Sequence, residues 1–504
     1  MAWPPHEDET LALFVGRESL HGTLETVLGE RGGAPLHFLL AWVVAHAGGG
    51  LVELRAVSAV LAVASVPVVA LLAARLAGRT IGLAATLLVS GSWLLLFHGV
   101  YGRMYSLFLL TSALSYLALL RALERGGARR FGLWVLAVLA TVATHPYGAL
   151  VLATQVIFVA LRRERIREAA WALAAVLVLG VPFWHTDLVL AGRFDVGVGG
   201  GGAKLGAPWE VLEYLWQVAG DSTAGWSFVL ALVVLVAAVG LRQLYRSRPA
   251  SALLTAVVFV VPALALALAR LGDSTSPESR HLIFALPFFA TLVAAGILDL
   301  ARRQPHAGPA LAIVGLALLL GSQVAWARER TPPLFTGEAS AAVRARKAAA
   351  AWLARTERPD DVLFGYEPVY LRAWERTRGG PATVIPRADP KLALRALRAA
   401  PKPLGRGVWV FDADDESNTE QRLTIPVLLP APRGAFEARA FGPYLIIRTR
   451  APTRTARRYL MLASQVMIVG KDLLIGDADV NFLTVRRALA RLEGRLPSGF
   501  SASR

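Results

Sequence analysis

The chain has 504 residues, of which 55% are hydrophobic and only 18% are charged, a composition too apolar for an ordinary soluble protein. It contains no cysteine, which excludes disulfide bonds and thiolate metal sites. The net charge of +17 is uneven, because residues 1–327 hold 23 Lys and Arg against 18 Asp and Glu, whereas residues 328–504 hold 30 against 18. A basic segment joined to a membrane domain favours an anionic lipid or acceptor as its partner, and no nucleic-acid partner is expected.

Residues 1–54 begin with an acidic run, Glu7, Asp8 and Glu9, and are predicted to lie outside the membrane. Apolar residues at helical spacing in 10–30 predict one or two juxtamembrane helices that lie flat on the bilayer. The apolar centre of "APLHFLLAWVVAHAG" (34–48) is about 14 residues long, too short for a span, so an interfacial helix is expected there. No signal peptide or helix ahead of this segment would carry it across the membrane. Either such a helix is missing from this sequence, or the orientation inferred below is wrong.

Residues 55–327 are predicted to form a polytopic helical membrane domain. A helical span needs about 20 apolar residues. Runs free of Lys, Arg, Asp and Glu occur at 56–74, 80–102, 104–120, 131–161, 169–186, 222–241, 249–269, 281–298 and 304–327. The run 131–161 suits two spans with a turn at "THPYG" (144–148), which makes about ten crossings. The glycine-rich stretch 195–208 is expected to be a flexible loop, because no strand precedes it and no helix opens directly after it.

The arginines predict the orientation, because cytoplasmic loops retain Lys and Arg. One alternating set of loops, 75–79, 121–130, 162–168, 242–248 and 299–303, holds 15 Lys and Arg, and the opposite set holds 5. The first set is therefore predicted to be cytoplasmic in a multi-pass protein of the plasma membrane. By parity, residues 1–54 and 328–504 are expected on the extracytoplasmic side.

Residues 328–504 are predicted to form a soluble α/β domain with a parallel sheet, because helical and strand patterns alternate there. The expected elements, in chain order, are a helix at 341–357, a strand at 360–366, a helix at 368–375, a strand at 381–386, a helix at 389–400, a strand at 405–415, a closing strand pair in 436–450, and helices at 453–469 and 481–493. Asp412, Asp414 and Asp415 follow a strand and are expected to form an acidic turn.

Polar residues gather at the predicted outer ends of the helices. They are His98, Tyr101, Arg103, Tyr105, His145, Tyr147, His185, Asp187, Arg280 and His281. Cations and aromatic rings beside the acidic start suit a site that binds an anionic, lipid-linked group and abstracts a proton near it. The alternatives are an aromatic belt for the tyrosines, histidines satisfied at the headgroup level, and arginines that extend to lipid phosphates. The acidic run also suits a helix start.

Several segments of the sequence, taken in order, resemble bacterial GT-C glycosyltransferases. The likeness is to the branch of the protein mannosyltransferases and aminoarabinose transferases. The blocks are "HEDETLAL", "GGAPLHFLLAWVVAHAGG", "ELRAVSAVLAVASVPVVALLAARLAGR", "FHGVYGRMYSLFLLTSALSYLALLRAL", "THPYGALVL" and "ESRHLIFALPFFATLVAAG", and the likeness covers roughly residues 4–300. The resemblance implies an inverting transferase that moves a sugar from a polyprenyl-phosphate donor to a lipid, glycan or protein acceptor. It also implies that Asp8 is the general base with Glu9 beside it, and that Arg103, Arg280 and His281 bind the lipid phosphate.

Tyr101, Tyr105 and His145 complete the predicted substrate-binding set. No metal-ligand spacing is present, so no metal site is predicted, although a divalent cation stays open as a cofactor. Two rival hypotheses remain. One is a transporter or flippase of lipid-linked saccharides, in which charges would lie at mid-membrane. The other is a degenerate, non-catalytic scaffold.

Overall fold

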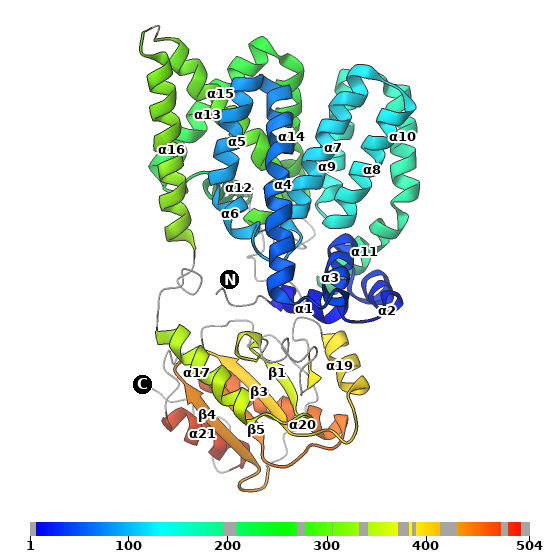
Figure 1. Cartoon of the computed structure of the whole chain (residues 1–504), viewed down its shortest axis with the longest axis vertical. Helices are drawn as coiled ribbons and strands as arrows, with labels where there is room; N and C mark the ends of the chain where they lie inside the picture. Colours follow the sequence, from blue (N-terminus) through cyan, green and yellow to red (C-terminus); the bar gives the residue numbers. More distant parts are fainter. Residues whose placement is uncertain are drawn as a thin grey trace. The chain divides into compact units, whose positions relative to one another are not determined.

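The computed structural model describes residues 7–194, 208–269, 278–304, 306–331, 341–370, 383–385, 390–413, 431–474 and 482–494. The chain divides into two compact units (Figure 1), the helical unit, Val15–Thr331, and the sheet unit, which takes Met1–Phe14 together with Pro332–Arg504. Three expectations fall on segments outside the described residues: the glycine-rich loop, apart from Pro208, the end of the helix predicted at 368–375, and the acidic residues Asp414 and Asp415.

The helical unit consists of helices joined by short connections. After α1 (Glu7–Gly16), which begins the described chain, they are α2 (Leu20–Glu25), the π-helix η1 (Thr26–Arg31), α3 (Pro35–His46), α4 (Leu51–Ala77), α5 (Arg79–Gly91), α6 (Trp93–His98), α7 (Tyr105–Arg125), α8 (Ala128–Thr144), α9 (Gly148–Arg162), α10 (Ile166–Leu179), α11 (Val181–Phe194), α12 (Pro208–Ser222), α13 (Ser227–Ser247), α14 (Pro249–Ala269), the 3-10 helix η3 (Ser279–Ala285), α15 (Leu286–Arg302) and α16 (Gly308–Arg330).

The predicted spans all fall on helices. Six helices of the described chain are long and apolar enough to cross a bilayer, namely α4, α7, α13, α14, the η3–α15 pair and α16, and the bent pair α10–α11 adds a seventh. The run 131–161 forms two helices, α8 and α9, as expected, whereas the run 80–102 is broken into α5 and α6. The predicted class, a polytopic helical membrane domain followed by an α/β domain, is confirmed.

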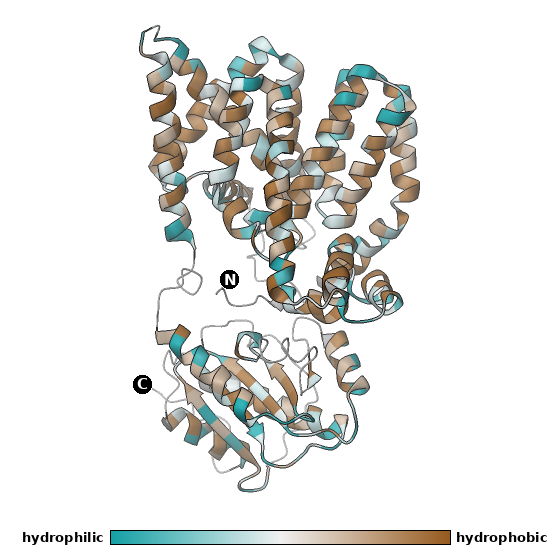
Figure 2. Ribbon diagram, in the orientation of Figure 1, coloured by the Kyte–Doolittle hydropathy of each residue, from teal (hydrophilic) through white to brown (hydrophobic). Residues whose placement is uncertain are grey.

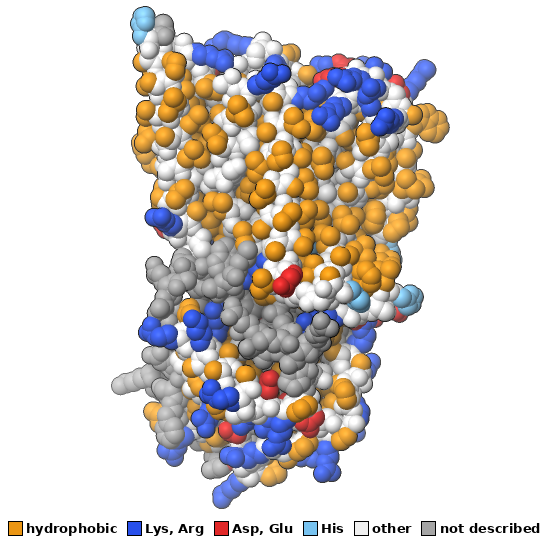
Figure 3. All heavy atoms as spheres, in the orientation of Figure 1, with side chains coloured by type: hydrophobic (Ala, Val, Ile, Leu, Met, Phe, Trp, Pro, Cys, Tyr) orange, Lys and Arg blue, Asp and Glu red, His pale blue; other side chains and the backbone are white. Residues whose placement is uncertain are grey.

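The arginine-rich connections lie together at one end of the helical unit. Arg248 Nη1 donates to the carbonyl of Arg75 at 3.1 Å, and Arg165 Nε donates to the carbonyl of Leu123 at 2.8 Å. Arg75 also pairs with Glu124. Brown apolar residues follow the helices between hydrophilic ends (Figure 2), and basic side chains gather beyond an apolar band at the upper end of the view (Figure 3). This distribution suits a bilayer around the helices.

Two glycines allow α13 and α15 to touch through their backbones. A Cβ atom on Gly240 of α13 would collide with the carbonyl oxygen of Leu292 in α15, and a Cβ on Gly296 would collide with the carbonyl oxygen of Val236. Small residues at such positions let membrane helices approach closely, where packing rather than water drives their association.

We expect Gly296→Ala to lower the stability of the helical unit by about 1–3 kcal/mol, because the added methyl group forces α13 and α15 apart. The measurement is the thermal unfolding midpoint of the full chain in one neutral detergent. Gly132→Ala in α8 is the matched control, since no atom lies within 4 Å of the added Cβ. Equal midpoints for the two variants would contradict the close contact.

The sheet unit contains a five-stranded sheet in the order β2-β1-β3-β5-β4. Its strands are β1 (Val362–Gly365), β2 (Thr383–Val384), β3 (Gly407–Asp412), β4 (Phe436–Phe441) and β5 (Tyr444–Thr449). Its further elements are α17 (Ala341–Thr356), the 3-10 turn η5 (Glu367–Val369), α19 (Pro390–Ala399), α20 (Ala456–Leu474) and α21 (Phe482–Leu492). The strands β2, β1 and β3 are parallel, as predicted, and in the closing pair β5 is antiparallel both to β3 and to β4.

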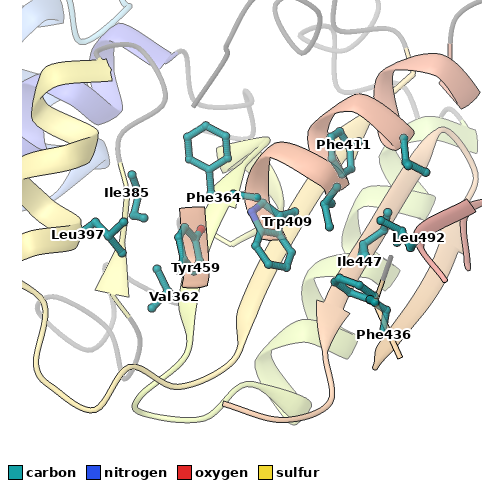
Figure 4. Close-up of a cluster of buried hydrophobic side chains, with 14 of the residues drawn as sticks. Val362, Phe364, Ile385, Leu397, Trp409, Phe411, Phe436, Ile447, Tyr459 and Leu492 are labelled. Carbon is teal, nitrogen blue, oxygen red and sulfur yellow. The ribbon is translucent and has the colours of Figure 1, made fainter. Parts of the chain in front are cut away.

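Alternating strand residues pack on the two faces of this sheet. Trp409 of β3 stacks on Tyr459 of α20 with ring centroids 5.3 Å apart, within a core to which α21 also contributes (Figure 4). On the opposite face, Trp352 of α17 packs under the guanidinium of Arg448 at 4.6 Å. Helices therefore cover both faces, which explains why all six residues of β3 and of β5 are buried.

A buried ion pair fixes the start of β1 against the start of β3. Arg406 donates to both carboxylate oxygens of Asp361 at 2.9 and 2.7 Å, and the backbone N–H of Arg358 donates to the same carboxylate. The two side chains are only 6% and 0% exposed. The pairing raises the pKa of Arg406 further, chiefly through the hydrogen bond to Asp361.

We expect Asp361→Ala to destabilise the sheet unit by about 3–5 kcal/mol, because Arg406 is then left buried without its carboxylate. The measurement is the urea concentration at which protease cleaves the sheet unit of the full chain. The exposed Arg398→Met of α19 serves as the control and should leave that concentration unchanged. A similar small effect for both variants would refute the structural role of the pair.

Candidate active site

Three connections at the other end of the helical unit carry most of the predicted polar residues. They are the turn between α6 and α7, the connection between α8 and α9, and the turn η3 before α15. In the second, Pro146 disfavours a helical conformation for His145, which is extended at φ −157° and ends α8. In the third, the backbone N–H of Glu278 donates to His281 Nδ1 at 3.1 Å, which fixes the start of η3.

Tyr105 is the centre of the cluster. It is the first residue of α7, and its side chain is fully buried. The guanidinium carbons of Arg103 and Arg280 lie 5.1 and 5.4 Å from its ring centroid, and Arg280 Nε donates to its hydroxyl oxygen at 2.9 Å. Two cations from distant parts of the sequence therefore meet on one aromatic ring.

Histidine and tyrosine rings surround this centre. Tyr105 has ring neighbours in His98 at 5.7 Å, His145 at 5.7 Å and His281 at 6.1 Å. His145 and His281 are 5.3 Å apart, and Tyr147 lies 5.1 Å from His281. The sequence prediction that these side chains share one end of the helices thus holds for their geometry.

Carboxylates orient two of the arginines. Arg280 pairs with Glu278, whose backbone carbonyl accepts a hydrogen bond from the hydroxyl of Tyr214 in α12 at 3.0 Å. Ser279 donates to Asp221 at 2.7 Å, and the same carboxylate pairs with Arg330 at 3.1 Å. Because Asp221 is buried, these bonds hold η3 in position beside the ends of α12 and α16.

Several residues at this end of the helical unit were not predicted from the pattern of spans. Arg55, a buried arginine near the start of α4, lies 5.3 Å from the ring of Tyr101, and Arg330 lies 5.0 Å from the ring of Trp93. Arg55 borders a long uncharged run on the side that is poor in arginine, which was a usable signal. For Glu278, Tyr214 and Asp221 no such signal exists, because their partners are set by packing.

Other candidates lie elsewhere. Asp8 and Glu9 occupy the first turn of α1, in residues grouped with the sheet unit, where Asp8 is half-buried and Glu9 is buried. His185 and Asp187 lie on α11, which packs against the residues after η1, as the 3.0 Å hydrogen bond from Gly33 N–H to the Thr186 carbonyl shows. Within the described chain, neither His185 nor Asp187 takes part in the ring contacts around Tyr105.

The cluster keeps one of its histidines neutral. His145 lies in the connection outside α8 and α9, and its burial, together with the charges of Arg103 and Arg280, lowers its pKa from 6.5 to about 3. Its Nδ1 accepts a hydrogen bond from the backbone N–H of Tyr147 at 3.0 Å, so the proton of the neutral ring is on Nε2.

This arrangement can hold an anion. Guanidinium groups donate to phosphate or carboxylate in a planar fork, and the hydroxyl of Tyr105, which accepts from Arg280, retains its own proton to donate. No group of three His, Asp or Glu side chains suited to a metal ion occurs within the described ranges.

No family model matches the sequence, and no curated protein matches it. Among solved structures, it is similar to ArnT of Cupriavidus metallidurans, an aminoarabinose transferase, in the apo state and bound to undecaprenyl phosphate. The TM-scores are 0.50 and 0.51 at 14% identity, over 90% and 89% of this chain and 94% of each ArnT chain. An oligosaccharyltransferase of Archaeoglobus fulgidus matches at a TM-score of 0.47 and 10% identity, over 82% of this chain and 64% of its own. The chain thus shares the fold of the GT-C glycosyltransferase ArnT, as the sequence resemblance predicted.

We expect acid to destabilise the protein partly through His145. A folded pKa of about 3 against about 6.5 in the unfolded chain means that the unfolded state binds the proton first. The stabilisation is therefore complete above about pH 6.5 and decreases towards pH 3, with a loss of about 2 kcal/mol at pH 5.

The measurement compares melting temperatures from pH 7 to pH 5 in wild type and in His145→Asn, whose side-chain oxygen can still accept from the Tyr147 N–H. The variant should show a flatter pH dependence. The exposed His306→Asn is the control and should keep the wild-type slope. Parallel slopes for all three proteins would exclude a buried neutral His145.

Proposed function

We propose that the protein is an integral membrane glycosyltransferase of the GT-C type, which transfers a sugar from a polyprenyl-phosphate donor to an acceptor on the extracytoplasmic face. Support comes from the shared fold and from the solved structure in which ArnT holds undecaprenyl phosphate. The observation that carries the proposal is the packing of Arg103 and Arg280 on Tyr105. That packing sets two guanidinium groups together at one end of the membrane helices, where the phosphate of a carrier lipid would lie.

In the proposed reaction, the acceptor oxygen forms a bond to the anomeric carbon while the bond from that carbon to the phosphate oxygen breaks. The phosphate leaves with the bonding electrons, and its charge is stabilised by Arg103, Arg280 and the Tyr105 hydroxyl. The acceptor hydroxyl, on a lipid, glycan or protein, gives its proton to the carboxylate of Asp8, with Glu9 beside it. One displacement of this kind inverts the anomeric configuration. A neutral His145 leaves the positive charge of the site to its arginines.

The distribution of charge favours this reading over the transporter. In the six long helices, all described Lys, Arg, Asp and Glu residues lie within the first or last two turns, and none lies at the centre. A carrier of lipid-linked saccharides would be expected to bind its cargo near the bilayer midplane. The scaffold hypothesis predicts the same fold without transfer, so a test of the chemistry must separate it from the enzyme.

The decisive experiment measures release of undecaprenyl phosphate from a set of undecaprenyl-phosphate-linked sugars, because that product is common to every sugar and acceptor. In proteoliposomes, Asp8→Asn should lower the rate at least about 100-fold by removing the base. Arg280→Gln should lower it by about 100- to 1000-fold by removing stabilisation of the leaving phosphate. The scaffold hypothesis is supported instead if wild type and all variants release none.

Binding of undecaprenyl phosphate, measured by native mass spectrometry, separates the two roles. Arg280→Gln should weaken it about tenfold, whereas Asp8→Asn should leave it unchanged. The matched controls are Arg125→Gln and Asp299→Asn. Arg125 is the last residue of α7 and Asp299 lies in the last turn of α15, both beside arginine-rich connections. Retained release by Asp8→Asn would refute the assignment of the base.

A further inference from the structure

A second basic site lies within the sheet unit, in residues that the proposed transfer reaction does not use. A cavity of about 510 Å³ is formed by the segment that leads into β4, the segment after β5 and the first turns of α20. Pockets of this size bind small molecules or the headgroup and adjoining part of a larger one. We propose that this cavity binds a phosphate-bearing amphiphile, with the phosphate on its arginines and the apolar part on its floor.

Four arginines line the cavity, and none of its lining residues that the structure describes is acidic. They are Arg433, Arg450, Arg457 and Arg458, all exposed. None of the four forms an ion pair within the part of the chain that the structure describes. The nearby carboxylates are engaged, since Glu437 pairs with Arg448 and Glu493 accepts from the backbone N–H of Gly434. Like charges gathered without counter-charges repel one another, and a bound anion removes that repulsion.

Two of these arginines stand where a helix disfavours cations. Arg457 and Arg458 are in the first turn of α20, a 19-residue helix with no acidic residue in that turn. The N-terminus of a helix carries partial positive charge, so cations there are unfavourable unless an anion accompanies them. Thr455 already caps this end, because its hydroxyl accepts from the Arg458 N–H at 3.2 Å. The uncompensated positive charge is therefore on the side chains of Arg457 and Arg458, which can bind a phosphate.

Apart from Gly434, Thr449 and Thr455, the rest of the described lining is apolar. Pro432, Phe436, Pro452, Met461 and Leu462 contribute to it, with alanines between them. A site for inorganic phosphate alone would have no need of such a floor, whereas a carrier or membrane lipid offers a charged head and an apolar body together.

The rim of the cavity is fixed before any ligand binds. The backbone N–H of Arg450 donates to the carbonyl of Ala435 at 2.9 Å. This bond joins the segment after β5 to the segment before β4. Thr453 donates to the Gly405 carbonyl through its backbone and its hydroxyl, at 2.7 and 2.8 Å. Little ordering is then needed on binding, which favours affinity.

The test titrates the full chain in neutral detergent with hexyl phosphate, inorganic phosphate and hexyl glucoside, by calorimetry. All titrations use the Arg280→Gln background, in which the proposed active site binds phosphate more weakly, so that loss of binding at the cavity can be told apart from failure of the proposed function. Hexyl phosphate should bind at least about tenfold more tightly than inorganic phosphate, the effect of burying two methylene groups. Hexyl glucoside should not bind measurably.

Matched variants locate the site. Arg457→Gln with Arg458→Gln should weaken both phosphate probes at least about tenfold, and Met461→Gln should weaken hexyl phosphate alone. Arg398→Gln, an exposed arginine on α19, is the control and should change neither. Equal binding of the two phosphates would indicate a site for free phosphate and overturn the amphiphile. Unchanged binding in the double variant, or binding of hexyl glucoside, would overturn the site itself.

Discussion

The packing of two guanidinium groups on the buried ring of Tyr105 is the interaction on which the charged end of the helical unit depends. Arg103 precedes α7 and Arg280 precedes α15, so one ring joins parts of the chain that are 177 residues apart. Charges buried so close together need compensation, and the ion pair with Glu278 and the ring faces provide it. His145 stays neutral chiefly because its burial lowers its pKa, and a third cation would also add to the repulsion from Arg103 and Arg280.

The two units use arginine in different ways. In the helical unit, arginines at one end donate to backbone carbonyls of neighbouring connections, while those at the other end pack on aromatic rings. In the sheet unit, Arg406 forms a buried ion pair with Asp361, whereas the arginines that line the cavity beside β4 and β5 are exposed to solvent. The excess of basic residues in 328–504 is therefore partly structural and partly left at the surface, where it can attract anions.

Much of the fold follows from the sequence because a bilayer permits few solutions. Long uncharged runs had to be helices, and the asymmetry of the arginines had to sort their ends. Residues as far apart as Tyr105 and Arg280 were therefore predicted to lie at the same end of the helices. The break between α5 and α6 and the amphipathic helix α12 could not be predicted from span length. Glu278, Tyr214 and Asp221 were missed because hydrogen-bond partners depend on packing angles. His185 and Asp187 were grouped with the cluster because span counting assigns an end of the membrane but no position around the bundle.

The glycine contact between α13 and α15 has a mechanical consequence. Two helices that touch through side chains can slide past each other when the side chains change rotamers. The backbones of α13 and α15 touch directly, so this freedom is lost. Because η3 runs directly into α15, any piston-like displacement of Arg280 along the membrane normal would have to carry α13 as well. The position of Arg280 along the helix axis is thus fixed by α13 and α15 together rather than by α15 alone. Any movement of this end of the helical unit would have to come from other elements.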